Sequence, residues 1–583
     1  MFERGQMARP GHPRGPIAGA LLLLLLALPG GAVAQEQAIL SARDIVHPVF
    51  AENGMVASQE AVASRIGAEV LRNGGNAVDA AVAVGFALAV TLPRAGNLGG
   101  GGFMLVHDAE SGETVAIDYR EMAPASAHKD LFLDAKGEVD TDKAWYSRAA
   151  AGVPGTVAGL ALALERYGTL SLAEAIQPAI RLARDGITVT RSLSDALTSA
   201  SERLLKVPAT AAIFFHPDGT PYQPGETLVQ ADLAWSLQQI AENGPKAFYE
   251  GAIAERIAAD MAAHGGPMTE TDLAAYKPVV RAPVTGSYRG HEIRSMPPPS
   301  SGGVHLVQIL NILEGFPLAE LGHNGAETIH LMAEAMKLAY ADRSEYLGDP
   351  DFWPVPVEGL TSKAYADHLR ATIDRELARP AEVIKPGDPL AYESPETTHF
   401  SVMDRWGNAV ANTYTINFSY GSGIVAAGTG ILLNNEMDDF SAKPGAPNAY
   451  GLIGGEANAI EPGKRPLSSM TPTLVLKDGK VLLATGSPGG PRIITTVLQI
   501  LLNVIDHGMN LAEATYATRV HHQWLPDELR VEEGLSPDTL RALRAKGYTV
   551  VEKNAMGSAQ SVLKAETGFH GAADPRRPGA LAV

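Results

Sequence analysis

The pattern of apolar residues changes along this chain at Thr397. Before it, residues 156–280 are rich in Ala, Leu and Glu at helical spacing. After it, residues 398–417 (THFSVMDRWGNAVANTYTIN) alternate on either side of a polar turn, which predicts two strands joined as a hairpin. Residues 471–487 repeat this pattern around Asp478-Gly479, a favoured pair for a two-residue turn. The chain must therefore combine helices with antiparallel hairpins.

Residues 74–93 are apolar on nearly every face and end at a proline, and Asn76 near their start is a favoured cap residue. We therefore expect a buried helix here. Four glycines then precede a strand-like run in NLGGGGFMLVHD. A phosphate-binding loop is the alternative, but no Lys-Ser/Thr pair and no G-x-G-x-x-G spacing follow, so close backbone packing is favoured. Residues 326–343 predict an amphipathic helix, and residues 492–508 predict a buried helix. Residues 296–306 predict a turn or loop.

Composition limits the classes of function. The 583 residues exceed one ordinary domain, although a single large α/β body remains possible. The net charge of −18 argues against nucleic acid, since binding to phosphates depends on cationic side chains. The chain has no cysteine, so disulfides and thiol catalysis are excluded and the fold must depend on packing.

The N-terminus has the pattern of a secretory signal peptide. Three arginines precede a 12-residue apolar run with six consecutive leucines, and Ala32-Val33-Ala34 follows as a cleavage motif. A membrane anchor is the alternative, but this run is short for a bilayer span. We expect residues 1–34 to be removed, leaving no membrane span and a periplasmic or secreted protein.

A polar linker leads directly into the first predicted strand. Residues 380–396 contain four prolines and no periodicity, which predicts an exposed segment where chains are readily cut. A threonine hydroxyl needs a base, and a break before Thr397 would give that residue an α-amine with a pKa of about 7.7 to 8.0. Thr398 would gain no such amine. The junction therefore suggests an N-terminal nucleophile, although an ordinary threonine at the start of a strand would look the same.

The surrounding motifs resemble the γ-glutamyltransferases, which belong to the N-terminal-nucleophile hydrolases. The resemblance covers essentially the whole mature chain and is densest after Thr397. It is carried by TTHFSVMDRWGNAVANTYTIN, GILLNNEMDDFSAKPG, RPLSSMTPT, TGSPGGPRI and HHQWLPDELRVE, with NLGGGGFML and AIDYREMAP in the first half. Several long motifs in the right order make this signal specific.

The resemblance implies catalytic roles for four residues. Thr397 matches the nucleophile, and Thr415 matches a second threonine that supports it. The 18-residue separation allows a strand, a turn and a return strand, so the two can lie side by side. Gly489 and Gly490 match the pair whose backbone N–H groups hold the oxyanion, a role that suits glycines because they allow close approach.

The resemblance also implies a site for the free amino-acid end of the substrate. Arg120 matches the guanidinium that pairs with the α-carboxylate, and Ser468 and Ser469 would donate hydroxyl hydrogen bonds to the same group. Taken alone, Arg120 is typical of a surface ion pair and the Asp438-Asp439 pair of a solvated turn. The residues that match acceptors for the α-ammonium are Asn417, Glu436 and Asp439, and Glu436 stands where the family has either Glu or Gln.

Two further patterns concern a possible lid loop and a possible metal site. Residues 441–455 match a lid loop of some members, in which Tyr450 matches an aromatic wall of the pocket. His521-His522 could suggest a metal, but neighbouring residues of a strand point to opposite faces and no H-E-x-x-H motif exists, so a metal site is rejected. No cofactor is expected.

The implied fold is a four-layer αββα sandwich of the α+β class. The precursor is expected to cut itself between Glu396 and Thr397, giving a large chain (35–396) and a small chain (397–583) that stay together. Thr397 would take the γ-glutamyl group from glutathione or a related amide and pass it to water, an amino acid or a peptide. Two rivals remain, a cephalosporin (glutaryl) acylase of the same superfamily and a periplasmic peptide-binding protein that is not cut.

Overall fold

The computed structural model describes residues 45–387, 398–443, 445, 448–449, 452 and 454–583. By its contacts the chain divides into Met1–Ile45 and Val46–Val583, and the fold below is that of the second unit. The expected signal peptide and the expected cleavage site, Glu396 and Thr397, lie outside the described residues. No helix within the described ranges is long and apolar enough to cross a membrane.

Seven antiparallel strands form a first sheet, and the hairpin predicted at residues 398–417 lies within it. Its strands β10 and β11 pair from Thr398↔Tyr414 to Met403↔Ala409. Strand β2 flanks β10 and strand β3 flanks β11, so the hairpin has neighbours on both sides. In order, the strands are β21 (Leu581–Ala582), β2 (Gly54–Ser58), β10 (Thr398–Asp404), β11 (Ala409–Thr415), β3 (Gly101–His107), β4 (Thr114–Tyr119) and β7 (Val279–Arg281).

A second sheet, also of seven antiparallel strands, contains the other predicted hairpin. At its turn Asp478 and Gly479 have φ of 51° and 75°, the left-handed conformation that a type I′ turn requires, so this prediction is confirmed. In order, the strands are β1 (Val49–Ala51), β20 (Phe569–Ala573), β19 (Gln560–Lys564), β15 (Lys480–Thr485), β14 (Thr473–Lys477), β9 (His291–Ser295) and β8 (Val284–Tyr288).

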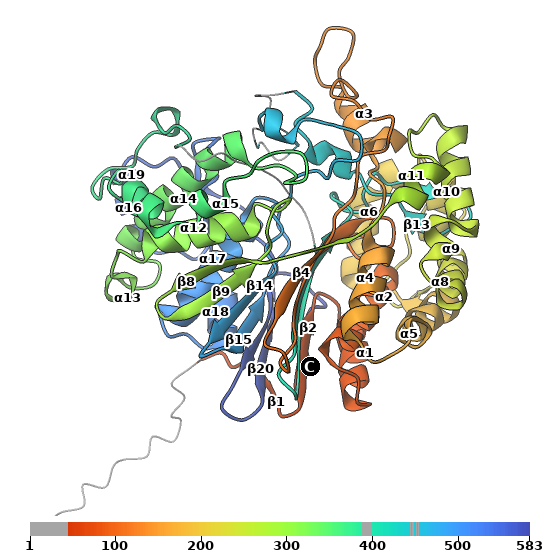
Figure 1. The fold of residues 1–583 in the computed structure, drawn as a ribbon, viewed down its shortest axis with the longest axis horizontal. Helices are drawn as coiled ribbons and strands as arrows, with labels where there is room; N and C mark the ends of the chain where they lie inside the picture. The colour runs from red at the N-terminus through yellow and green to blue at the C-terminus, as the bar shows by residue number, and fades with distance from the viewer. Residues whose placement is uncertain (1–44, 388–397, 444, 446–447, 450–451, 453) are drawn as a thin grey trace, which may run out of the picture. The chain divides into compact units, whose positions relative to one another are not determined.

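The two sheets pack face to face through one apolar layer (Figure 1). Because side chains alternate along a strand, Met55 and Ala57 of β2 enter this layer together with Leu474 of β14. Val56, between them, points the other way and joins the core under the helices. The period-two pattern of each strand therefore builds two different cores, one on each face of its sheet.

Helices cover the outer face of both sheets. The helices whose buried side chains join the core on the outer face of the first sheet are α1 (Ala61–Arg72), α2 (Ala77–Thr91), α4 (Thr156–Tyr167), α5 (Leu172–Asp185), α6 (Arg191–Leu204), α7 (Pro208–Phe214), α8 (Ala231–Asn243), α9 (Lys246–Tyr249), α10 (Ala252–Ala263) and α11 (Glu270–Ala275). Those packed on the second sheet are α12 (Gly302–Leu313), α13 (Leu318–Leu321), α14 (Ala326–Tyr346), α15 (Val357–Leu360), α16 (Lys363–Arg370), α17 (Arg492–Ile505), α18 (Leu511–Tyr516) and α19 (Pro537–Ala545). The order helix, sheet, sheet, helix confirms the αββα sandwich (Figure 1).

Short elements connect these layers. They are α3 (Thr141–Tyr146), the strand pairs β5 (Ile187–Thr188) with β6 (Thr227–Leu228) and β12 (Val425–Ala426) with β13 (Ile431–Leu432), and a small sheet of β16 (Val520–His521), β17 (Leu529–Val531) and β18 (Val550–Glu552).

The helix expected at residues 74–93 is α2, and every residue in it is buried. Asn76 caps it, because its side-chain oxygen accepts from the N–H groups of Val78 and Asp79 at 2.9 and 3.0 Å. The Asn76 N–H in turn donates to Asp79 Oδ2 at 2.8 Å, which completes a capping box. The prediction of a buried helix is confirmed.

The expectation of an amphipathic helix at residues 326–343 is wrong in one respect, since α14 is buried on nearly all sides. Its polar residues find partners inside the protein instead of facing water. Lys337 Nζ lies 2.5 Å from Glu334 Oε1, and Asp342 accepts from Gln308 Nε2 at 2.5 Å. Likewise residues 296–306, expected as a turn or loop, already contain the start of α12 at Gly302.

The described part of the expected linker is only partly exposed. Ala381 and Ile384 are buried, and the Gly387 N–H donates to Asp342 Oδ1 at 2.6 Å. The expectation of an exposed segment is therefore wrong for these positions. Residues 388–396 lie outside the described residues.

Both sheets mix strands from either side of Thr397. In the first sheet, β10, β11 and β21 follow that residue in sequence, while β2, β3, β4 and β7 precede it. In the second sheet, β14, β15, β19 and β20 follow it, and β1, β8 and β9 precede it. Neither part of the chain forms a complete sheet without the other.

Candidate active site

The candidate site lies where the hairpin β10–β11 opens. Thr398 begins β10, is fully buried, and has a hydroxyl with no hydrogen-bond partner among the described residues. Its partner in the ladder is Tyr414, so Thr415 ends β11 one residue beyond this pair. The expected nucleophile, Thr397, precedes Thr398 in sequence but is not among the described residues.

Thr415 is held from two directions. Its Oγ1 accepts from the Asn417 N–H at 2.7 Å, and its carbonyl accepts from Asn97 Nδ2 at 2.9 Å. Asn97 comes from the glycine-rich run, which lies against β11. A Cβ at Gly100 would stand 1.9 Å from the Thr415 carbonyl oxygen, and one at Gly102 would stand 2.4 Å from Tyr414 Cβ. The expected role of these glycines in close backbone packing is confirmed.

Gly489 and Gly490 lie in the loop between β15 and α17, in the conformations that glycine favours, with φ of 141° and 62°. Their carbonyls accept from Arg492 Nε at 2.9 Å and from the Ile493 N–H at 3.0 Å respectively. Among the described residues, neither N–H has an acceptor. Gly489 borders the same cavity as Thr415, so the two sheets meet at this point.

Arg120 follows β4 and is fully buried, so the alternative of a surface ion pair is excluded. Its Nη1 pairs with Glu436 and its Nη2 with Asp439. These two carboxylates come from one 3-10 turn, Glu436–Asp439, which places residues three apart on the same side. Arg120 also donates to the carbonyl of Pro466 at 3.0 Å and to that of Leu467, next to Ser468, at 3.2 Å. The structure thus brings Arg120 together with two of the expected ammonium acceptors.

This cluster carries more negative than positive groups. Glu121 adds a third carboxylate, 3.6 Å from Arg120 Nη1, and neither of its oxygens accepts a hydrogen bond from a described residue. Burial raises the pKa of Glu121 to about 7, while the charge of Arg120 opposes the shift. Burial also raises the pKa of Glu436 well above its usual range, against the same opposing charge. A second cation beside these carboxylates would relieve both shifts.

The remaining expected binding residues surround the cluster. Asn417 Nδ2 donates to the carbonyl of Asn435, the residue before the 3-10 turn, at 2.9 Å. Ser468 Oγ accepts from the Met470 N–H at 3.1 Å, and Ser469 Oγ accepts from Arg343 of α14. Because each serine oxygen acts as an acceptor here, its own O–H remains available to donate.

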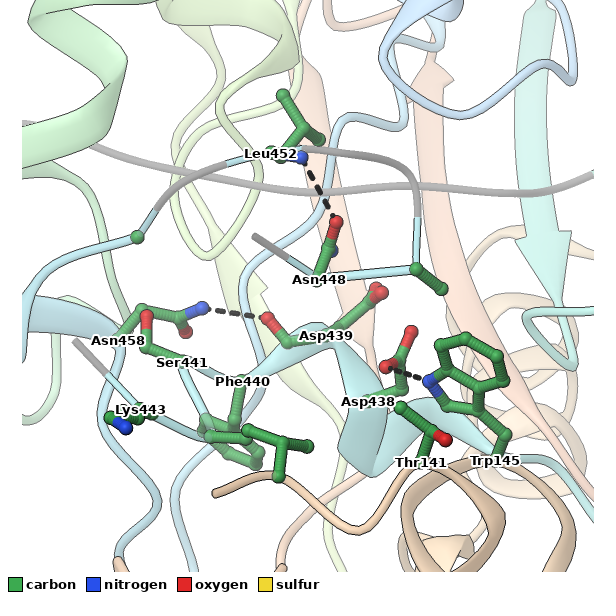
Figure 2. Close-up of a pocket in the computed structure, with 14 residues that line it drawn as sticks. Thr141, Trp145, Asp438, Asp439, Phe440, Ser441, Lys443, Asn448, Leu452 and Asn458 are labelled. Atoms are coloured by element: carbon green, nitrogen blue, oxygen red, sulfur yellow. Dashed lines mark hydrogen bonds between the residues drawn. The ribbon is translucent and has the colours of Figure 1, made fainter. Parts of the chain in front are cut away.

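A cavity of about 70 Å³ borders the end of the 3-10 turn, where Asp438 and Asp439 line it (Figure 2). The indole N–H of Trp145 donates to Asp438 Oδ1 at 2.7 Å, and Asn458 Nδ2 donates to the Asp439 carbonyl at 2.7 Å. Asp438 is buried, so it does not lie in a solvated turn. The described parts of the expected lid border this cavity, and Leu452 is buried there. Tyr450 lies outside the described residues.

Replacement of Asp438 by Asn is expected to change how stability depends on pH. Burial, and next the charge of Asp439, raise the pKa of Asp438 to about 8, whereas an unfolded chain ionises this group near about 4. The folded protein therefore binds more protons between these values, and this group makes folding less favourable as the pH rises through them. The Asn variant lacks this dependence.

Thermal unfolding of both proteins at pH 5 and pH 9 measures the effect. Asp438→Asn should gain stability relative to the unsubstituted protein at the higher pH. A difference between the two proteins that stays constant over this range would show that Asp438 is ionised when folded.

Each of the paired histidines lies beside a different polar side chain. His521 shares a hydrogen bond with Thr495 Oγ1 at 2.9 Å, and His522 Nε2 lies 3.3 Å from Asp527 Oδ1. Within the described ranges, no group of three or more His, Asp or Glu side chains could hold a metal ion.

Comparison with known proteins identifies the family of this chain. The family model described as Gamma-glutamyltranspeptidase matches residues 63–583. The chain is 59% identical over 534 residues to the glutathione hydrolase proenzyme of Escherichia coli (strain K12), which covers 91% of this chain and 92% of that protein.

Two solved structures share the fold. The cephalosporin acylase from Bacillus halodurans has a TM-score of 0.83 at 30% identity and covers 94% of this chain and 98% of its own. The γ-glutamyltranspeptidase of Helicobacter pylori has a TM-score of 0.56 at 48% identity and covers 60% of this chain and 97% of its own. The match of the family model and of the relatives over nearly the whole sequence shows that this chain belongs to the γ-glutamyltranspeptidase family.

Proposed function

We propose that this protein is a γ-glutamyltransferase and glutathione hydrolase that cuts itself between Glu396 and Thr397. The observation that carries the proposal is the buried cluster of Arg120, Glu436 and Asp439. A γ-glutamyl group ends in an α-carboxylate and an α-ammonium on one carbon. A site for this end needs a cation and anions close together away from water, and the buried cluster supports the proposal because it has both kinds of charge.

Substrate binding would rearrange the cluster's charges. The α-carboxylate would be bound by Arg120 and by the hydroxyls of Ser468 and Ser469. The α-ammonium would be bound by Glu436, Asp439 and the side-chain oxygen of Asn417. Because the unoccupied cluster has surplus carboxylates with raised pKa values, an incoming ammonium would replace protons held there and restore the usual ionisation.

Catalysis would proceed in two steps. Thr397 Oγ attacks the γ-carbonyl carbon, the C–N bond of the amide breaks, and the leaving amine takes the proton that the hydroxyl gave up. The free α-amine of Thr397 would act as the base, and the Thr415 hydroxyl would orient Oγ. The N–H groups of Gly489 and Gly490 would stabilise the oxyanion. Water or an acceptor amine then attacks the ester and releases Thr397.

The described hairpin register supports this arrangement. Thr415 ends β11 directly beyond the pair Thr398↔Tyr414, at the open end of the hairpin where β10 begins. The base for self-cleavage must be a different group, because the α-amine does not exist until the bond is broken. No described residue is assigned to that role.

The proposed mature enzyme is a heterodimer of residues 35–396 and 397–583, exported to the periplasm or beyond by the signal at residues 1–34. The interleaved strands would keep the two chains in one unit. Its substrates would be glutathione and related γ-glutamyl compounds, and its acceptors water, amino acids or dipeptides.

A cephalosporin (glutaryl) acylase is the alternative function within the superfamily, since a cephalosporin acylase shares the fold. The surplus of carboxylates beside Arg120 favours the γ-glutamyl group, because a glutaryl group has no ammonium to neutralise them. The third reading, a peptide-binding protein that is not cut, is disfavoured by membership of an enzyme family whose E. coli relative is named a proenzyme.

A denaturing gel with N-terminal sequencing tests the proposal. The purified protein should give two bands and should release p-nitroaniline from γ-glutamyl-p-nitroanilide. The smaller band should begin Thr-Thr-His-Phe, which locates the cut before Thr397. One full-length band in a protein that binds but does not hydrolyse the anilide would instead support the binding protein.

A further inference from the structure

The backbone is strained directly after Thr415. Asn417 and Tyr420 have φ of 69° and 65°, in the left-handed region that few residues other than glycine adopt. Gly421 and Gly423 follow with φ of 55° and 79°. A bulky residue such as Tyr420 keeps this conformation only when its surroundings hold it, so the turn at residues 417–423 must be fixed by its contacts.

Arg203, in the last turn of α6, holds the middle of this turn. Its Nη1 donates to the carbonyl of Gly421 at 2.9 Å, and its Nη2 donates to that of Ser419 at 2.5 Å. A Cβ at Gly423 would stand 2.7 Å from Arg203 Nη1, so a glycine at this position leaves room for the guanidinium. The two carbonyls lie on either side of Tyr420 in sequence, so one planar cation fixes the backbone around the strained residue.

The start of the turn contacts Thr415. The Asn417 N–H donates to Thr415 Oγ1 at 2.7 Å, and the next N–H, that of Phe418, donates to Asn435 Oδ1 at 3.1 Å. A hydroxyl has one proton, and an oxygen that accepts from Asn417 must direct its own O–H elsewhere. The shape of the turn therefore limits the directions in which the Thr415 hydroxyl can donate.

We propose that Arg203 is a positioning residue for the Thr415 hydroxyl, on which it acts through the turn at residues 417–423. The inference rests on the proposed function, in which the Thr415 hydroxyl orients Thr397 Oγ. Arg203 precedes the proposed cut and the turn follows it. In the cut enzyme the large chain would thus supply the group that holds a catalytic residue of the small chain in place.

The loss of Arg203 should reduce kcat more than it changes KM. Glu436 and Asp439, which would bind the α-ammonium, are held by Arg120 and not by Arg203. The loss of two hydrogen bonds from a charged donor should loosen the turn and misplace the Thr415 hydroxyl. Displacement of a catalytic group in this way predicts a kcat roughly 10- to 100-fold lower for γ-glutamyl-p-nitroanilide.

Three variants test this expectation, and a denaturing gel verifies that each is cut. Arg203→Met retains an apolar stem without the donors and should show the full loss of kcat. Arg203→Lys retains the charge on a single nitrogen and should lie between Arg203→Met and the unsubstituted enzyme. Arg256→Met is the matched control, because Arg256 also donates to a carbonyl beyond Thr397, that of Gly428, which lies outside the turn. It should retain the kcat of the unsubstituted enzyme.

A double-mutant cycle distinguishes positioning from general loosening of the fold. If Arg203 acts through the Thr415 hydroxyl, Arg203→Met should lower kcat by roughly 2-fold or less when Thr415 is already Ala, which is the scatter of additive pairs. A general loss of structure would lower kcat by the same factor in both backgrounds.

Added guanidinium gives a second measurement. Arg203 is half-buried, so Arg203→Ala leaves a space that a guanidinium ion can enter from water. Millimolar guanidinium chloride should restore part of the lost kcat, whereas the same concentration of sodium chloride should not. This measurement decides the question if variants with Ala at Thr415 release too little p-nitroaniline to compare.

The two proposals fail in different ways. An unsubstituted protein that releases no p-nitroaniline contradicts the proposed function. An active enzyme contradicts only the role of Arg203 if its kcat survives Arg203→Met, or if the loss is equal with and without the Thr415 hydroxyl. A loss that guanidinium does not relieve also contradicts that role. If Arg203→Met is not cut, Arg203→Lys takes its place in the same comparisons.

Discussion

Thr397→Ala should accumulate as one uncut chain that releases no detectable p-nitroaniline from γ-glutamyl-p-nitroanilide. The substitution removes both the hydroxyl proposed to attack the preceding carbonyl and the nucleophile of each later turnover, so cutting and catalysis should fail together. Thr397→Ser retains a hydroxyl and should still be cut, although more slowly. A denaturing gel followed over days and the anilide assay measure both effects.

Thr398→Ala is the matched control for this variant. Thr398 stands next in sequence and its hydroxyl has no partner among the described residues, so its loss should cost little. This variant should be cut and active. If purified Thr397→Ala is cut at the same bond, another agent does the cutting and the proposed self-cleavage is wrong.

The second large effect is selectivity for the α-ammonium. The unsubstituted enzyme should prefer γ-glutamyl-p-nitroanilide over glutaryl-p-nitroanilide by about 10⁴ in kcat/KM, because sites built to bind a group reject analogues that lack it by that order. A glutaryl group would bring its carboxylate beside one arginine that already faces Glu436, Asp439 and Glu121. Without the ammonium, no cation replaces the protons that burial favours on Glu121 and Glu436, and the hydrogen bonds of the ammonium are lost.

Variants of the cluster distinguish the proposed binding of the α-ammonium from the proposed binding of the α-carboxylate. Asp439→Asn should reduce the preference for the γ-glutamyl over the glutaryl anilide, mainly because kcat/KM for the γ-glutamyl anilide should fall roughly 10²- to 10³-fold. A fall of this size corresponds to the cost of breaking a buried charge pair. Asp438→Asn, beside it, should change the preference far less, because that carboxyl is largely neutral at pH 7. Arg120→Ala should impair both anilides and also destabilise the fold, since it leaves Glu436 and Asp439 buried without their cation. Comparable kcat/KM for the two anilides with unsubstituted enzyme would favour the acylase.

Local patterns in the sequence were enough to predict the hairpins, because strand alternation and turn residues act over a few positions. The turn at Asp478-Gly479 and the pairing of residues 398–417 follow directly from them. The pattern at residues 326–343 was misleading for the same reason. Its charged residues suggest a face toward water, but whether a face is covered depends on segments distant in sequence, here Gln308 and Gly387 around Asp342.

The candidate site was predicted from motif resemblance, and some of its neighbours were missed. Asn97, which holds the Thr415 carbonyl, lay within a quoted motif but was treated as part of the glycine run. Glu121 follows Arg120 directly and could have been noticed as a second charge in the same motif. Arg343 had no local signal, because it reaches Ser469 across 126 residues of sequence. Trp145 likewise reaches Asp438 from a separate helix.

The interleaving of strands from either side of Thr397 gives the proposed cut a thermodynamic consequence. An intact precursor folds and unfolds as one molecule, so its stability does not depend on concentration. Once the chain is cut, complete unfolding releases two molecules, and dilution favours the separated state. Release of the edge strand β21 does not complete the separation, however, because the hairpin β10–β11 lies between β2 and β3 and has to leave both neighbours. The cut enzyme would therefore persist at low concentration through a high barrier to dissociation and not through its equilibrium.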